Sequence, residues 1–358
     1  MLTDATLRSQ VDALWDKLWS GGLSNPLDAI EQLSFLLFFK RLDEVEQDAE
    51  RAARFRGKKH QPIFPDVKLR WSHWTQLPAD QALRHVKEKV FPFIKTLGGE
   101  GGSFAQQMAN AEFKINKSSL LIEATKAIDA MHISSQNQDV QGDLYEYLLS
   151  KLNTAGQNGQ FRTPRHIIRM MVKMADPQPG DRLCDPAAGT CGFLVNAYQH
   201  ILETHTRPDV LTHDEDGFPH FLIGDQLSAK EHDFLQTKSV TGYDNDSGMT
   251  MLRIGCMNLM LHGIASPNFR CTDTLSKGFD EERLYDVVLA NPPFKGAIDS
   301  ADVNPSLPAK CKKTEILFLH LLRSMSLQFK SGVLFEQVFW KPVASFRVYR
   351  KGDCRSRY

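Results

Sequence analysis

Residues 291–294, with the sequence Asn-Pro-Pro-Phe, are of types that can hold and activate an amino group on a planar ring. They follow the apolar run 286–290, which predicts a buried strand that delivers Asn291 to the edge of a sheet. The two prolines would keep the backbone extended and leave the Pro292 carbonyl available as an acceptor. Phe294 offers a flat apolar face on which a base can stack. The alternative is a strand exit that the prolines merely stiffen.

The chemistry that this motif favours is methylation of an aromatic amino group. Such a group is a poor nucleophile because its lone pair is delocalised into the ring. Two acceptors, the Asn291 side-chain oxygen and the Pro292 carbonyl, would localise that lone pair on the nitrogen. A donor with a neutral thioether leaving group needs no strong base, so catalysis would consist of positioning and hydrogen-bond polarisation. A target base within a duplex would have to leave the helix first.

The run DPAAGTCGF, residues 185–193, predicts a ligand-binding turn. Asp185 ends a predicted strand, and Gly189 and Gly192 open a helix, where small residues let the backbone approach a ligand closely. The crevice at the strand ends is where open α/β sheets bind their ligands. Alanine at position 187 breaks the GxGxxG pattern, which disfavours a dinucleotide. A purely structural turn is the alternative.

The elements that must position these residues alternate between strands and helices. Strand-like runs cover 182–185, 239–244, 269–273 and 285–290, and helical runs lie near 193–203, 247–261 and 314–328. This alternation predicts a doubly wound α/β domain with a parallel sheet over residues 136–330. Before it, helical stripes such as Leu14, Trp15, Leu18 and Trp19 predict an N-terminal helical domain over residues 1–135. Residues 331–358 form an atypical basic tail.

Composition excludes several classes of protein. The chain has 358 residues, enough for two domains, with 43 basic and 43 acidic side chains. That balance gives no sign of a protein that grips DNA alone through a basic face. The six cysteines show no CxxC spacing, so we expect reduced thiols in the cytoplasm and neither a metal site nor a disulfide framework. The N-terminus lacks the apolar core of a signal peptide, and no apolar run is long enough to span a membrane.

Five motifs in order carry a family resemblance: GDLYEYLLSKLNTAGQNGQFRTPRHIIRMM, DPAAGTCGF, GYDNDSGMTMLRIGCMNLMLHGI, CTDTL and VLANPPF. The chain resembles the modification (M) subunit of type I restriction-modification systems, within the N6-adenine DNA methyltransferase family. The resemblance implies a Rossmann-like S-adenosylmethionine-dependent methyltransferase fold behind an N-terminal α-helical domain. It implies site-specific methyl transfer from S-adenosyl-L-methionine to a flipped adenine.

The resemblance also assigns roles to single residues. The methionine end of the cofactor would be bordered by Gln160, Phe161, Thr163 and Pro164. The cofactor turn would consist of Asp185, Gly189, Thr190 and Gly192. Asp244 would bind the ribose hydroxyls or the methionine-side groups, and Asp273 would approach the adenine amino group of the cofactor, although both could be simple strand-end caps. The catalytic residues would be Asn291, Pro292 and Phe294.

The partners that the resemblance implies are double-stranded DNA, a specificity subunit that reads the DNA sequence, and a second copy of the M subunit. It leaves open whether a restriction subunit joins them. The neutral net charge agrees with delegated recognition of DNA.

The C-terminal part departs from the family pattern. After the predicted helix the family continues into an apolar strand, whereas this chain passes from Lys330 and Ser331 straight to Gly332 and then into the basic tail. We therefore expect a C-terminally truncated chain whose sheet is incomplete beside the 286–290 strand, unless residues 344–349 supply an edge strand. One alternative function is a catalytically impaired M subunit that acts only in assembly. Another is a protein glutamine-N5 methyltransferase, which also uses an NPP-aromatic motif, and a nicotinamide dehydrogenase is the least favoured.

Overall fold

A computed structural model describes most of the chain and divides it into two compact units, Met1–Gly159 and Gln160–Tyr358. The described residues are 5–23, 25–55, 59–60, 62–97, 102–132, 147, 163, 165–213, 217, 219–220, 222–245, 249–264, 266–291, 301–305, 307 and 326–333. The boundary expected near residue 135 falls outside these residues and stays a prediction.

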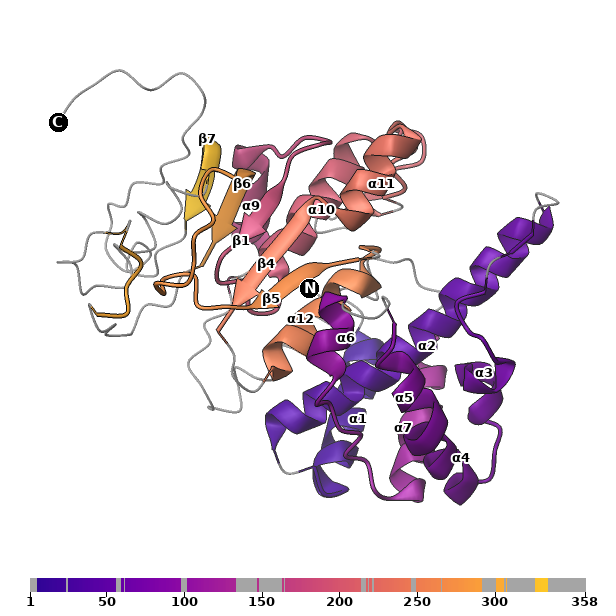
Figure 1. The fold of residues 1–358 in the computed structure, drawn as a ribbon. Coiled ribbons are helices and arrows are strands. Elements are labelled where there is room, and N and C mark those ends of the chain that lie inside the picture. The colour runs from indigo at the N-terminus through magenta and orange to yellow at the C-terminus, as the bar shows by residue number, and fades with distance from the viewer. Residues whose placement is uncertain are drawn as a thin grey trace, which may run out of the picture. The chain divides into compact units, whose positions relative to one another are not determined.

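The first unit is helical in its described part, as expected from its sequence stripes (Figure 1). Its elements are α1 (Ala5–Ser20), α2 (Pro26–Phe55), η1 (Val67–Leu69), α3 (Trp71–Trp74), α4 (Ala79–His85), η2 (Val86–Val90), α5 (Phe91–Ile94), α6 (Ser103–Met108) and α7 (Ser118–Ala130). The 30-residue α2 is the longest of them, and its apolar run from Phe35 to Phe39 is buried. There Phe35 and Phe39 pack against Phe91, with ring centroids 5.1 and 6.4 Å apart.

A local irregularity joins α4 to α5. The segment η2 is a π-helical turn, and it ends immediately before a helix whose second residue is Pro92. Because proline has no backbone N–H to donate, the regular hydrogen-bond ladder cannot continue unchanged through it. The wider turn lets the helix pass this point while Val86 and Val90 stay buried.

Charged side chains tie the loop before α3 to the long helix α2. The Arg70 guanidinium donates to Asp43 Oδ1 over 2.6 Å, and the Ser72 backbone N–H donates to Asp43 Oδ2 over 2.7 Å. Burial opposes ionisation of Asp43, but the bonds from Ser72 and Arg70 outweigh it and lower the pKa of this carboxyl. Asp43 and Arg70 therefore form a largely buried ion pair in which the carboxylate stays charged.

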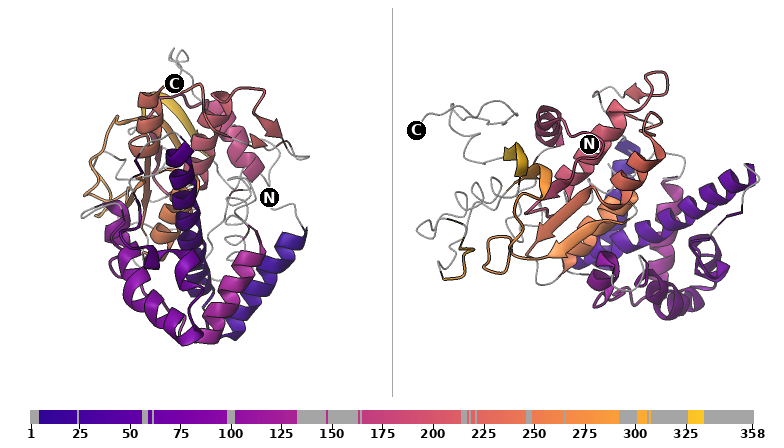
Figure 2. Two further views of the ribbon diagram at one scale, coloured as in Figure 1. Left: turned by 90° about the vertical axis from the view of Figure 1, so that its right-hand side faces the viewer. Right: turned by 45° about the horizontal axis from the view of Figure 1, so that its top comes forward.

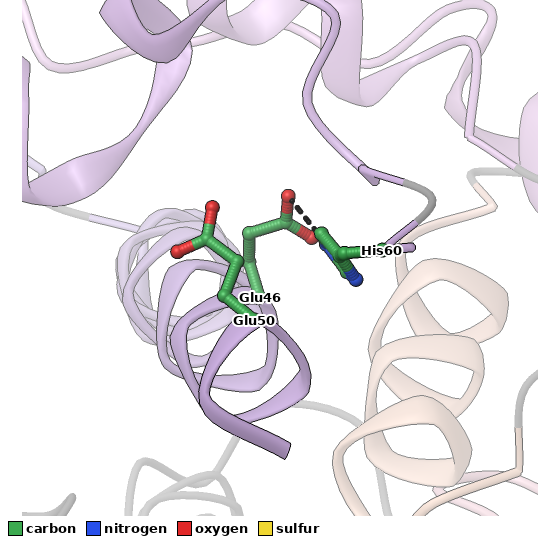
Figure 3. Close-up of side chains that lie close together, drawn as sticks. All are labelled: Glu46, Glu50 and His60. Atoms are coloured by element: carbon green, nitrogen blue, oxygen red, sulfur yellow. Dashed lines mark ion pairs between the residues drawn. The ribbon is translucent and has the colours of Figure 1, made fainter. Parts of the chain in front are cut away.

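A second group, formed by α2 and the segment that follows it, brings possible metal-ligand atoms together (Figure 3). Glu46, Glu50 and His60 have ligand atoms within 4.8 Å of one another. His60 Nε2 lies 3.2 Å from a Glu46 oxygen, the Ile63 N–H donates to the other Glu46 oxygen, and Arg70 donates to Glu50. Because protein donors already engage both carboxylates, we interpret the group as an anchor that ties the loop after α2 back to the helix.

The second unit contains a five-stranded parallel sheet in the order β5-β4-β1-β6-β7 (Figures 1 and 2). The strands are β1 (Leu183–Asp185), β4 (Val240–Asp244), β5 (Asn268–Cys271), β6 (Tyr285–Ala290) and β7 (Ser326–Val333), and a separate short hairpin pairs β2 (Thr212–His213) with β3 (Pro219–His220). The helices are α9 (Arg165–Ala175), α10 (Gly192–Thr204), α11 (Ala229–Thr237) and α12 (Thr250–Leu261). The chain winds outward from β1 to β5 and then returns to the other side of β1, so the fold is doubly wound as predicted.

Helices and loops cover the two faces of this sheet. On one face α10 contacts β1, β4 and β6, with α9 and α12 packed beside it. Strand residues of alternate parity, including Cys184, Tyr243 and Val288, face the other side, where they join a core with Leu275 and Phe279. Both faces are thus buried, as a parallel sheet requires.

The strand β7 corrects our expectation that the sheet lacks a strand beside β6. We expected a helix to reach residue 328 and no strand beside the one that carries Asn291, unless residues 344–349 supplied it. Instead, Ser326–Val333 pairs in parallel with β6, with a register shift between Tyr285 and Val287. The segment SLQFKSGV alternates apolar and polar residues, a strand pattern that the preceding leucine-rich run obscures. The rest of the predicted helix, and residues 344–349, lie outside the described part of the chain.

Among the described residues, no helix is both long enough and apolar enough to cross a membrane.

Candidate active site at the carboxyl edge of the sheet

The polar residues predicted from the sequence gather at one edge of the sheet. Asp185 ends β1, Asp244 ends β4, Asp273 follows β5 and Asn291 follows β6. Because all of these strands are parallel, their carboxyl ends meet at the same edge. The strand order reverses beside β1. In open α/β sheets, ligands usually bind outside the carboxyl ends of the strands at such a point.

The turn after β1 is held in a left-handed conformation. Gly189 has φ 51° and Cys191 has φ 63°, and Gly192 then starts α10. The Ala188 N–H donates to the Tyr243 carbonyl over 2.8 Å, and the Cys191 N–H donates back to the Ala188 carbonyl over 2.7 Å. A Cβ added to Gly189 would meet no atom of the described residues within 4 Å, so none of these residues fills the space beside the turn at this glycine. A ligand can approach the backbone through that space.

Asp244 holds this turn from the neighbouring strand. Its Oδ2 accepts a hydrogen bond from the Gly189 N–H over 2.9 Å, although the two residues are 55 positions apart. The contact of Asp244 with the cofactor stays a prediction, and the carboxylate lies against the predicted cofactor turn. Asp244 therefore links β4 to the turn that follows β1.

Asp185 is a buried acid with unusual electrostatics. It is 1% exposed, and its Oδ1 accepts a hydrogen bond from the Ala187 N–H over 3.0 Å. Burial raises the pKa of Asp185 to about 8, the Ala187 bond opposes the rise, and the charge of Asp244 adds to it. At pH 7 the carboxyl is thus largely protonated in the ligand-free protein. A cationic group placed beside it would favour its ionised form.

Asp273 behaves in part as the strand-end cap that the sequence also allowed. Its Oδ1 accepts from the Leu275 N–H over 2.9 Å, and its backbone carbonyl accepts from Ser276. Asn245, just after β4, donates to its Oδ2 over 3.3 Å. Asp273 therefore shapes the loop at the edge of the site, and its contact with a cofactor stays a prediction.

Only part of the remaining predicted site can be placed. Asn291 is half-buried directly after the buried Ala290, and Thr163 is buried before α9. Gly189, Thr190 and Gly192 lie in the turn. The predicted residues that lie outside the described part of the chain are Gln160, Phe161, Pro164, Pro292 and Phe294.

Sequence reasoning missed the residues that support the turn from α12. A Cβ on Gly255 would lie 2.9 Å from the Gly189 carbonyl oxygen, and the Asn258 amide donates to the Thr190 carbonyl over 2.8 Å. Glycine and asparagine both lower the stability of a helix interior, so their presence in the apolar α12 was the available sign of a special role.

Two family models match the chain. The model described as N-6 DNA Methylase matches residues 136–339, and the one described as HsdM N-terminal domain matches residues 7–128. Together they cover both units, and the first alone covers more than half of the sequence.

Curated relatives agree with these matches. The type I restriction enzyme EcoEI methylase subunit of Escherichia coli is 29% identical over 318 residues, covering 84% of this chain and 59% of the relative. The EcoKI methylase subunit of Escherichia coli strain K12 is 27% identical over 304 residues, covering 80% of this chain and 50% of the relative. The chain thus spans about half to three fifths of the length of the curated relatives it matches.

Solved structures show the same fold. A modification subunit of a putative type I restriction enzyme from Vibrio vulnificus YJ016 superposes with a TM-score of 0.72 at 24% identity, covering 91% of this chain and 71% of that one. A chain from a study of complex assembly and conformational transition in a type I restriction-modification system gives a TM-score of 0.63 at 26% identity, covering 93% and 64%.

Proposed function

This chain belongs to the N-6 DNA methylase family, and from that premise we propose that it transfers a methyl group from S-adenosyl-L-methionine to the N6 amino group of adenine in DNA. We propose further that it does so as the modification subunit of a type I restriction-modification system, the class of its curated relatives.

The observation that carries the proposal is the convergence of three side chains on one edge of the sheet. Asp185 and Asp244 end two adjacent strands and Asn291 follows a third, beside a turn where no described residue fills the space at Gly189. A methyl donor and an acceptor amino group must be held together for transfer, and this arrangement offers a cofactor turn next to a hydrogen-bonding amide.

The residues fit S-adenosyl-L-methionine. This ligand carries a cationic sulfonium and an ammonium group, and the buried Asp185 carboxyl would gain a counter-charge on binding. Asp244 would accept hydrogen bonds from the ribose hydroxyls, and Gly189, Thr190 and Gly192 would line the turn. Asp273, together with Gln160, Phe161, Thr163 and Pro164, would complete the cofactor site. When bound, the cofactor supplies an electrophilic methyl group with a neutral leaving group.

The protein's own part in catalysis is to polarise the target amino group. Asn291 Oδ1 and the Pro292 carbonyl would each accept a hydrogen bond from this amino group and so raise the electron density on the nitrogen. Phe294 would stack on the flipped base and hold its plane. The proton that methylation makes acidic would leave through the same hydrogen bonds to solvent.

The partners we propose are double-stranded DNA, a specificity subunit and a second copy of this chain, within a cytoplasmic complex that a restriction subunit can join. The equal numbers of basic and acidic residues support delegated sequence recognition. The relative studied for complex assembly supports an assembled state for this class of protein.

Transfer of a labelled methyl group to DNA tests the proposal, with and without a cognate specificity subunit. We expect site-specific labelling of adenine N6 only with that subunit present, and its loss on Asn291→Ala. Labelling of a protein glutamine, or robust site-specific labelling of DNA by the single chain, would contradict the assignment.

A further inference from the structure

The helix α12 touches the predicted cofactor turn with its bare backbone. A Cβ on Gly255 would lie 2.5 Å from the Phe269 ring and 2.9 Å from both the Cys191 sulfur and the Gly189 carbonyl oxygen. Real Cβ contacts essentially never come so close, so a side chain at this position would force the helix and turn apart. Glycine here therefore sets the distance between α12 and the turn.

Asn258 lies one helical turn after Gly255, on the same face of α12. Its side chain is fully buried, and its Nδ2 donates to the Thr190 carbonyl over 2.8 Å, across 68 positions of sequence. A carbonyl can only accept, which fixes the orientation of the amide group. Asn258 Oδ1 is buried and has no hydrogen-bond partner among the described residues, so the side chain acts as a donor alone.

Three successive carbonyl groups of the turn have contacts within the protein, one inside the turn itself and two with α12. The Ala188 carbonyl accepts from the Cys191 N–H, the Gly189 carbonyl packs against Gly255, and the Thr190 carbonyl accepts from Asn258. Because a peptide group is planar and trans, a Gly189 carbonyl that faces α12 turns the Thr190 N–H to the opposite side. The electronegative carbonyls of Gly189 and Thr190 are thereby kept away from the side of the turn that faces away from α12.

We infer that Asn258 is a positioning residue, which fixes the peptide orientations of the cofactor turn before a ligand binds. Gly255 sets the approach of α12, and the Asn258 amide then locks the Thr190 peptide. Pre-organisation of this kind raises affinity because the ligand does not have to order the turn. The identity of the ligand as S-adenosyl-L-methionine rests on the proposed function, whereas the ordering of the turn does not.

Amide hydrogen exchange of the ligand-free full chain tests the ordering directly. In Asn258→Ala we expect the N–H groups of Gly189 and Cys191 to exchange on the order of ten- to a hundred-fold faster. The matched control is Asn268→Ala at the amino end of β5. This change removes a hydrogen bond of 3.2 Å from the Asn268 side-chain amide to the Thr241 hydroxyl. The control should leave exchange in residues 186–192 unchanged. Unaltered exchange of the turn in a folded Asn258→Ala protein would overturn the inference.

Calorimetric titration with S-adenosyl-L-methionine gives the second readout. Asn258→Ala should weaken binding at least tenfold, and Asn268→Ala should not. The isosteric change Asn258→Asp keeps the volume and adds a pH test. Below its pKa the introduced carboxyl can donate to Thr190 as the amide does, and above it the carboxylate repels that carbonyl. Its affinity relative to the natural chain should therefore recover as the pH falls.

The two proposals fail in distinguishable ways. In the first case the natural chain binds S-adenosyl-L-methionine, Asp185→Ala binds it more weakly, and both Asn258 variants bind it as the natural chain does at every pH. This result would refute the role of Asn258 and leave the proposed function intact. A natural chain that does not bind this cofactor at all would refute the proposed function, while hydrogen exchange would still decide whether Asn258 orders the turn.

Discussion

Replacing Asp185 with asparagine should make the ligand-free protein more stable at neutral and alkaline pH. The reference pKa of an aspartate is 3.8, and burial with the nearby charge of Asp244 raises that of Asp185 to about 8. Between these values the folded protein holds a proton that the unfolded chain has released. The free energy of unfolding must then fall as the pH rises, and the fall ends once the pH exceeds the folded pKa.

The magnitude follows from the linkage relation. One proton corresponds to slightly more than 1 kcal/mol per pH unit, so the range from pH 5 to pH 8 removes a few kcal/mol. A whole domain is typically stable by only about 5–15 kcal/mol, so the effect is readily measured. For a unit of this size, 1 kcal/mol corresponds to roughly 2–4 °C in Tm. Asparagine keeps an acceptor for the Ala187 N–H but carries no charge, so the variant avoids the free-energy cost of burying a carboxylate.

Thermal unfolding of both proteins from pH 5 to pH 9 at constant ionic strength is the assay. Subtracting the Tm values of Asp185→Asn from those of the natural chain cancels the contributions of groups that titrate alike in both proteins. The difference should show the natural chain losing Tm relative to the variant up to about pH 8 and then levelling off. A flat difference, or a natural chain that gains stability relative to the variant as the pH rises, would refute the reasoning.

Three further predictions concern other parts of the structure. Asn291→Ala should lower methyl transfer on the order of 100- to 1,000-fold, because a positioned hydrogen bond is lost in the transition state, while calorimetry shows S-adenosyl-L-methionine binding unchanged. A similar loss of binding would instead make Asn291 a cofactor residue. Asp43→Asn should destabilise the first unit by about 1–3 kcal/mol, measured by urea unfolding, because it removes the buried carboxylate that pairs with Arg70 and leaves this guanidinium only Glu50 as a charge partner. Since the pKa of Asp43 is lowered, its contribution is present at neutral pH and lost in acid, so the two proteins should converge as the pH falls below about 4. Gly255→Ala should destabilise the second unit by about 1–3 kcal/mol through overpacking against Phe269 and Gly189, and a variant that melts with the natural chain would show that α12 can retreat at no cost.

Local patterns were enough to predict the parts of the site that follow strands. The runs before Asp185, Asp244 and Asn291 are short and strand-like, and parallel strands place their carboxyl ends at one edge. Predicting each strand therefore also predicted that its terminal residue lies at that edge, whereas the roles of these residues in a site stay predictions.

Contacts between distant segments could not be predicted in this way. The bond from Asn258 to Thr190 spans 68 positions, and that from Gly189 to Asp244 spans 55, so neither leaves a trace in local periodicity. The strand β7 was missed for a different reason. Its residues Leu327 and Phe329 also continue the helical spacing of the run before them, and only pairing with β6 decides between the two structures.

The close contact of α12 with the turn also places sulfur atoms where they can report on motion. Cys191 and Cys256 are completely buried, and burial raises the pKa of both thiols. Neither thiol is therefore reactive while α12 contacts the turn. The exposed Cys271, at the end of β5, has no such protection. A thiol reagent would modify Cys271 at once and reach Cys191 only when α12 separates from the turn. The rate of that slow modification would measure how often the site opens, and a bound ligand would lower it in proportion to its occupancy.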